Sequence, residues 1–217
     1  PPFWGSPATQ SKQTPEAVWA VPPTTAASIE SQVDTVEFLE LLQTGRPVLL
    51  DGGMGTMLQA KGLPVGATPE LTALEHPEWL LDIHRAYVEA GAQILYANTF
   101  GANREKLSHC GRTVEEIVPA AVALAKEAAQ GRALVALDIG PTGQLLEPPG
   151  ILDFETAVDI FAQVVKAGAA AGADLIVIET MTDLQEARAA LLAAKENSSL
   201  PVLVTMTYEA TGRTFLG

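Results

Sequence analysis

The sequence predicts an α/β fold built on a parallel sheet, and two observations lead to that prediction. Short apolar runs that are typical of buried strands alternate with longer segments in which apolar residues recur at helical spacing. The short runs are nearly continuous in apolar residues, as expected for a parallel sheet that helices cover. Strands joined through helices in this way form either a (β/α)8 barrel or an open, doubly wound sheet.

The first elements are predicted from where apolar runs stop. A short helix is expected over residues 36–42. A strand is expected at 47–51, because the apolar run there ends at Asp51 and opens into a glycine-rich turn. A brief helix after that turn is expected to end at Gly62, and the prolines and glycine within residues 64–69 indicate an irregular segment.

From residue 76 onward, helices and strands alternate strictly. Helices are predicted at 77–91, 113–130, 154–171 and 183–196, and strands at 93–99, 133–139, 175–178 and 201–207. Asp153 is expected to cap the helix that follows it. The five predicted strands all end in polar residues, and the carboxyl ends of parallel strands form the edge at which both kinds of sheet bind ligands.

Asp51 at the end of the first predicted strand has two possible roles. Gly52, Gly53 and Gly55 follow it, and glycines allow a ligand to approach the main chain closely. A carboxylate at the mouth of a parallel sheet or barrel can hold the amino group of a substrate. An Asp immediately before a helix also commonly caps it by accepting hydrogen bonds from free backbone N–H groups. This stretch alone is compatible with either role.

Residues 1–32 differ from the rest of the chain. Prolines are scattered there among Ser, Thr, Gln and Ala, without helical or strand periodicity. We therefore expect an irregular, proline-rich extension or linker at 1–32 and a single folded region at 33–217. The chain begins with Pro rather than Met, which is expected of a piece of a longer polypeptide.

Composition excludes several classes of partner. A formal charge of −13 argues against nucleic acids and anionic membrane surfaces as partners. The sequence has no apolar run long enough to span a bilayer. Cys110 is the only cysteine, so an internal disulfide is impossible and a reducing, cytoplasmic location is expected. A single thiol is also too few for a site that requires several cysteine ligands.

Five segments at the predicted strand ends resemble the homocysteine S-methyltransferase domain, and most closely the N-terminal domain of cobalamin-dependent methionine synthase. These segments are Leu50–Thr56, Ala97–Gly101, Asp138–Gly143, Ile178–Met181 and Thr211–Thr214. The resemblance extends from about Thr35 to Gly217. It implies a (β/α)8 barrel, of which this chain would contain about the first five βα units, with the remaining strands expected beyond Gly217.

The resemblance also implies a reaction, with its cofactors and partners. Members of this family bind zinc through three cysteines on later strands, and homocysteine joins the metal as a thiolate. Zinc holds the thiol deprotonated at neutral pH, where a free thiol is a poor nucleophile. The expected methyl donor is methylcobalamin on another domain, so the implied partners are homocysteine and the cobalamin- and folate-binding domains of the same parent protein.

The family's functional positions can be carried over to this sequence. By position, Asp51 and Glu179 are the carboxylates expected to hold the substrate ammonium group. Gly52, Asn98 and Thr99 are expected to line the same mouth. The loop formed by Gly140, Pro141, Thr142 and Gly143 is expected to shape the pocket or its contact with the domain that carries the methyl donor.

The zinc cysteines are absent from this sequence, and Cys110 lies away from the family's ligand positions. We therefore expect no metal site here and no activity from this chain alone. One alternative is a non-catalytic half-barrel that binds a small amino acid or a protein partner. Another is an unrelated α/β enzyme in which Asp51, Asp138 and Glu179 form a cluster that acts in acid/base catalysis or binds a divalent cation.

Overall fold

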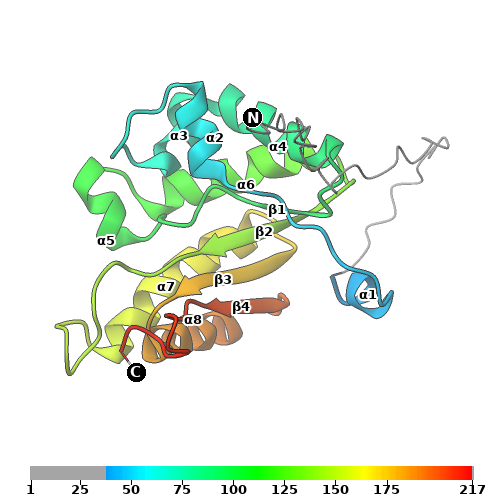
Figure 1. Cartoon of the computed structure of the whole chain (residues 1–217). Coiled ribbons are helices and arrows are strands. Elements are labelled where there is room, and N and C mark those ends of the chain that lie inside the picture. The colour runs from blue at the N-terminus through cyan, green and yellow to red at the C-terminus, as the bar shows by residue number, and fades with distance from the viewer. Residues whose placement is uncertain (1–37, 217) are drawn as a thin grey trace, which may run out of the picture. The chain divides into compact units, whose positions relative to one another are not determined.

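The structure is a computed structural model that describes residues 38–216 (Figure 1). The extension expected at 1–32 lies outside the described residues, as does the start of the helix expected at 36–42. The first described helix is α1, Phe38–Gln43.

The fold is organised around a parallel sheet whose strands follow one another in sequence order (Figure 1). The strands are β1 (Ile94–Tyr96), β2 (Leu134–Ile139), β3 (Leu175–Met181) and β4 (Val202–Met206). In the ladder, Ile94 pairs with Leu134, Ala136 with Leu175, and Ile176 with Val202. A doubly wound sheet reverses its strand order at a switch point. The described strands contain no such reversal, so this order favours the barrel over the doubly wound alternative.

The strand predicted at 47–51 is reduced to a single bridge between Leu50 and Ile94. The sheet therefore has four strands in the described residues, and the prediction of five was wrong in this respect. Asp51 N donates to Ile94 O at 3.0 Å, but the N–H of Tyr96 donates to the Asp51 carboxylate at 2.9 Å. A side chain thus takes the hydrogen bond that would have extended the ladder, and pairing ends at the residue that enters the site.

The predicted helices are confirmed, and their ends agree with the predictions to within a few residues. They are α2 (Met54–Lys61), α4 (Pro77–Glu89), α6 (Val114–Ala129), α7 (Phe154–Ala170) and α8 (Leu184–Asn197). Asp153 caps α7 as predicted, because its carboxylate accepts a hydrogen bond from Thr156 N at 2.9 Å. Thr113 and Glu116 form a reciprocal capping box at the start of α6.

Two stretches contain short helices that the sequence analysis did not predict. One holds the 3-10 helix η1 (Pro69–Leu71) and α3 (Thr72–Glu75), and the other holds α5 (Arg104–Leu107) and the 3-10 helix η2 (Ser108–Cys110). Both are too short to show an apolar period. The first of them contributes directly to the site described below.

The two faces of the sheet are covered differently. Side chains that alternate along β2 and β3, including Val135, Leu137 and Ile176, are fully buried against α6, α7 and α8. The opposite face forms a separate apolar cluster in which Ile94, Leu134, Leu175 and Val177 surround Leu41 of α1. The long helices α6, α7 and α8 on one face, joined to sequential parallel strands, are the arrangement of a (β/α)8 barrel wall.

No helix within residues 38–216 has the length and apolar character needed to cross a membrane.

His84 on α4 is fully buried among apolar residues, and burial lowers the pKa of its imidazole to about 4. It is therefore a neutral packing residue at physiological pH.

Candidate functional site

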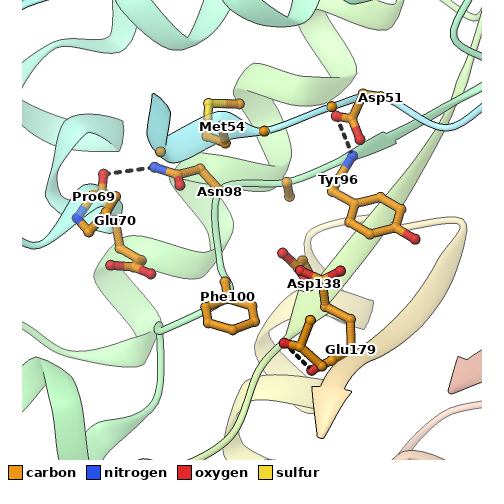
Figure 2. Close-up of a pocket in the computed structure, with 14 residues that line it drawn as sticks. Asp51, Met54, Pro69, Glu70, Tyr96, Asn98, Phe100, Asp138 and Glu179 are labelled. Atoms are coloured by element: carbon orange, nitrogen blue, oxygen red, sulfur yellow. Dashed lines mark hydrogen bonds between the residues drawn. The ribbon is translucent and has the colours of Figure 1, made fainter. Parts of the chain in front are cut away.

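A cavity of about 410 Å³ opens at the carboxyl ends of β1, β2 and β3 (Figure 2). Its lining includes four carboxylates, and none of its lining residues is Lys, Arg or His. The residues that line it are Asp51, Gly52, Gly53, Met54, Gly55, Pro69, Glu70, Tyr96, Ala97, Asn98, Phe100, Asp138, Glu179 and Thr180. A cavity with this composition is suited to a ligand that carries a positive charge.

Asp51 is placed by the end of the bridge with β1. Its carboxylate accepts the hydrogen bond from Tyr96 N, which fixes the side chain against the sheet (Figure 2). Burial raises the pKa of Asp51 from its ordinary value of 3.8 to about 7, and the nearby charge of Glu179 adds to the shift, while the Tyr96 hydrogen bond opposes it. The cap hypothesis is not supported, because Gly53 is the N-cap of α2 and no side chain caps this helix.

Glu179 stands beside an irregularity in β3. The β3–β4 register shifts between Ile178 and Met181, and Thr180 between them has a φ of +53°. Thr180 N donates to the Thr205 hydroxyl at 3.0 Å, which ties the irregular turn to β4. A positive φ is strained for a β-branched residue. Burial raises the pKa of the Glu179 carboxyl, and the side chain lines the cavity.

Asp138 lies near the end of β2, and the sequence analysis gave its side chain a role only in the alternative of an acid/base or divalent-cation cluster. Thr99 fixes its main chain, because the Thr99 hydroxyl donates to Asp138 O at 2.8 Å and accepts from Asp138 N at 3.1 Å. Its side chain is buried, and Oδ1 has no hydrogen-bond partner. Burial, together with the charges of Glu179, Asp51 and Glu70, raises the pKa of Asp138 well above its ordinary value.

Glu70 and Asn98 form the other side of the cavity (Figure 2). Glu70 is buried on η1, and its Oε1 accepts a hydrogen bond from Gly101 N at 2.6 Å. The Asn98 amide donates to Pro69 O at 2.8 Å and to the Thr72 hydroxyl at 3.1 Å. The predicted site residue Asn98 therefore lines the mouth as expected, and its amide nitrogen anchors the segment that carries Glu70.

Sequence reasoning missed Glu70, Tyr96 and Phe100 as lining residues. Glu70 lies in a segment without periodicity, and nothing local distinguishes it from a surface glutamate. Burial and three neighbouring carboxylates raise the pKa of the Tyr96 hydroxyl to about 12. A polar residue within a short apolar strand was the available signal for Tyr96, because such a residue commonly faces a site rather than a core.

The structure places Thr99 and the loop 140–143 behind the cavity wall rather than in it. Thr99 does not line the cavity, and its hydroxyl binds the Asp138 main chain. In the loop, Thr142 N and Oγ1 donate to the Glu186 carboxylate on α8 at 2.7 and 2.6 Å. A Cβ on Gly140 would lie 2.4 Å from the Phe100 ring, so the loop contributes to the shape of the cavity through Phe100.

The glycine turn brings main chain to the cavity as the sequence suggested. A Cβ on Gly52 would lie 2.8 Å from the Tyr87 hydroxyl, so a larger residue here would require the Tyr87 side chain to move. Gly53 and Gly55 also line the cavity, at the start of α2. The first N–H groups of a helix have no partner within the helix, and here no side chain caps them.

The described residues do not fit a zinc site. Across residues 38–216, no group of three His, Cys, Asp or Glu side chains is arranged to hold a metal ion. Cys110 lies in η2 and is not among the cavity-lining residues, and its thiol donates to Leu107 O at 3.1 Å. The hypothesis that Asp51, Asp138 and Glu179 form a divalent-cation cluster is therefore not supported.

Comparisons with known proteins place this chain in a family. The family model of homocysteine S-methyltransferase matches residues 48–217. The chain is 30% identical over 210 residues to a methionine synthase of Mycobacterium leprae (strain TN), an alignment that covers 88% of this chain and 17% of that protein. It is 32% identical over 180 residues to betaine–homocysteine S-methyltransferase 1 of Mus musculus, with 77% of this chain and 42% of that protein covered.

A solved structure is similar in fold. The crystal structure of the homocysteine methyltransferase MmuM from Escherichia coli, in its metallated form, superimposes with a TM-score of 0.72 at 23% identity. The match covers 81% of this chain and 68% of that chain. The sequence here spans less than half the length of the two relatives named above. On the strength of the family match over residues 48–217, this chain belongs to the homocysteine S-methyltransferase family.

Proposed function

We propose that the cavity binds the amino-acid portion of homocysteine, with Asp51 and Glu179 holding its ammonium group. The observation that carries this proposal is the clustering of four buried or half-buried carboxylates around a cavity that has no basic lining residue. Burying a carboxylate without a positive partner is costly, and a cationic ligand provides that partner. The size of the cavity, about 410 Å³, leaves room for an amino acid.

The carboxylate of the same ligand requires hydrogen-bond donors. The glycine turn at residues 52–55 supplies them, because it brings uncapped main-chain N–H groups at the start of α2 to the cavity. Helix N-termini favour anions through these N–H groups and the helix dipole. Asp51 and this turn are adjacent in sequence, so one segment would recognise both charged groups of the amino acid.

We further propose that the parent protein transfers a methyl group to the homocysteine thiolate to make methionine. Zinc would hold the thiol deprotonated, and methylcobalamin on a separate domain would donate the methyl group. The similarity to methionine synthase supports this choice of donor, with cobalamin- and folate-binding domains as partners. The single cysteine and the thiol substrate fit a reducing cytoplasm.

Residues of this chain would bind and orient the amino acid, and the metal ligands would come from elsewhere. Only one cysteine is present in the whole sequence, and it lies outside the cavity lining. We therefore propose that the 217-residue chain binds homocysteine without converting it. The alternative, a half-barrel that binds an amino acid and has no catalytic role, would have the same cavity. The two hypotheses differ in whether the parent protein transfers a methyl group to homocysteine.

Calorimetric titration of the 217-residue chain with L-homocysteine tests the binding proposal. Asp51→Asn and Glu179→Gln should each weaken binding by roughly 10- to 100-fold, because a hydrogen bond to a charged group contributes about 1.5–3 kcal/mol. The exposed residues Asp159 and Glu196 offer matched controls, Asp159→Asn and Glu196→Gln, which should bind like the unmodified chain.

The same experiment has a clear contradicting outcome. If both carboxylate variants bind homocysteine as tightly as the controls, the ammonium site has been wrongly assigned. Incubation of the chain with homocysteine and methylcobalamin should yield no methionine above the protein-free rate. Methionine formation by this chain would contradict the proposal that it binds without turnover.

A further inference from the structure

Asp138 is the most buried of the cavity carboxylates whose side chains make no hydrogen bond. The residue is 6% exposed, lines the cavity, and has an Oδ1 atom that is buried without a partner. The Thr99 hydroxyl bonds both the N–H and the carbonyl of Asp138, so the main chain is fixed at the point where this carboxyl group enters the cavity. A buried polar atom in this state is costly, and such atoms commonly mark a position that a ligand fills.

The groups that face Asp138 from the neighbouring elements are all acidic or neutral. Asp51 approaches from the glycine turn, Glu179 from β3, Glu70 from η1, and the Tyr96 hydroxyl from β1. Lys106 is a cation outside this set, and it does not line the cavity. Its ammonium lies 5.3 Å from the centre of the Phe100 ring, and it interacts with Glu70 and Glu186. No described lining residue therefore provides a positive charge to balance an ionised Asp138.

We propose that Asp138 is a third ligand-binding carboxyl of this cavity, which carries a proton while the cavity is empty and releases it when the ammonium group of an amino acid enters. This inference rests on the proposed function. In the exchange, the carboxyl O–H bond breaks, the electron pair stays on the carboxylate, and the proton passes to the buffer. The new carboxylate then pairs with the bound ammonium group.

The structure explains why a proton is exchanged rather than simply added. The four carboxylates around this one cavity repel one another, and a proton relieves that repulsion when no cation is present. An entering ammonium group supplies the same relief and makes the proton unnecessary. Ligand and proton therefore compete, and each proton released makes the affinity rise up to tenfold per pH unit.

The test is calorimetry at pH 7.5 in phosphate, HEPES and Tris, whose ionisation enthalpies differ. L-homocysteine and L-methionine are both used, because methionine has the same ammonium group and no thiol that could release a proton. The unmodified chain should release at least about half a proton per ligand bound. Asp138→Asn should bind with less than half of that release, whereas Asp159→Asn should behave like the unmodified chain.

A measurement without ligand tests the same carboxyl directly. The infrared carbonyl stretch of a protonated carboxylic acid should be present in the empty protein at pH 7.5. The band should weaken when methionine or homocysteine is added, and it should be weaker in Asp138→Asn than in the unmodified chain, because Asp51 with a pKa of about 7 contributes only part of it. Because the unmodified chain alone provides the first two observations, they do not depend on the folding of the variant.

The outcomes separate this inference from the proposal on which it rests. Binding with the same heat in all three buffers would overturn the role of Asp138 and leave the ammonium site intact. Equal proton release from Asp138→Asn and the unmodified chain would also overturn it. Failure of either amino acid to bind at all would overturn both proposals.

Discussion

The same strands supply apolar side chains to the helix-covered face of the sheet and acidic side chains to the cavity at its carboxyl edge. On β2, Val135 and Leu137 are fully buried against helices, whereas Asp138, one residue before the end of the strand, has a buried carboxyl oxygen without a hydrogen-bond partner. On β3, Ile176 packs into the helix layer and Glu179 enters the cavity. The change from an apolar layer to an acidic site therefore takes place within two or three residues.

From this difference we infer that the helix layer stabilises the fold and that the cavity lowers its stability. Apolar burial beneath α6, α7 and α8 removes surface from water and is favourable. The cavity buries carboxylates that repel one another, and it contains a threonine at positive φ. Strain and uncompensated charge of this kind are typical of sites that require a ligand to complete them.

The largest expected effect is in the apolar layer. Phe161 on α7 is fully buried there, and Phe161→Ala should lower the free energy of unfolding by about 3–5 kcal/mol, because it leaves a cavity among well-packed side chains. Urea unfolding measures the loss. Phe215 is 63% exposed, so Phe215→Ala should change stability little. Equal effects of the two substitutions would mean that the helix layer does not dominate stability.

The next prediction concerns the cavity, where a substitution should raise the free energy of unfolding rather than lower it. The pKa of Asp51 is about 7 in the folded chain against an ordinary value of 3.8, so the folded state binds more protons between these values. Its ionisation should therefore lower stability as pH rises, by roughly 2–3 kcal/mol between pH 5 and pH 8. Asp51→Asn removes this cost and should stabilise the chain at pH 8 more than at pH 5.

Urea unfolding of the unmodified chain, Asp51→Asn and the control Asp159→Asn at both pH values checks this sign. The informative quantity is the difference between each variant and the unmodified chain, because other groups such as His84 also titrate. If Asp51→Asn is less stable than the unmodified chain at pH 8, the carboxylate stabilises the fold. The conclusion that the cavity lowers stability would then be wrong for this residue.

The smallest expected effect concerns the irregular turn beside Glu179. Thr180→Gly should raise the free energy of unfolding by about 1 kcal/mol, because glycine tolerates the positive φ without strain. It should also weaken homocysteine binding a few-fold, since the turn that holds Glu179 becomes less rigid. Thr207→Gly is the control, because Thr207 is exposed and has no positive φ. Tighter binding by Thr180→Gly would contradict the positioning role of this turn.

Much of the fold followed from local patterns. The long helices α6, α7 and α8 carry apolar residues at helical spacing, and Asp153 lies where a cap is required. Asp51, Asn98 and Glu179 come directly after apolar runs, and parallel strands bring such positions to one edge. Their common location at the cavity was therefore predictable, although their roles in binding remain predictions.

The rest depended on contacts between distant parts of the chain. The first predicted strand became a single bridge because the Asp51 carboxylate, rather than a carbonyl group, accepts the next hydrogen bond from β1. Thr99 turned out to bind the Asp138 main chain instead of lining the mouth. Neither outcome has a signature in the residues immediately around it.

The sequence by itself determined the alternation of helices and strands and the polar strand ends, because periodicity and capping depend on neighbours within a few residues. Only the tertiary structure brought Glu70 of η1 to face Asp51, Asp138 and Glu179, and tied Thr142 to Glu186. Those groups come from separate elements of the chain, and their burial and their mutual repulsion arise only when the fold brings them together. The acidity of the cavity is therefore a property of the folded arrangement.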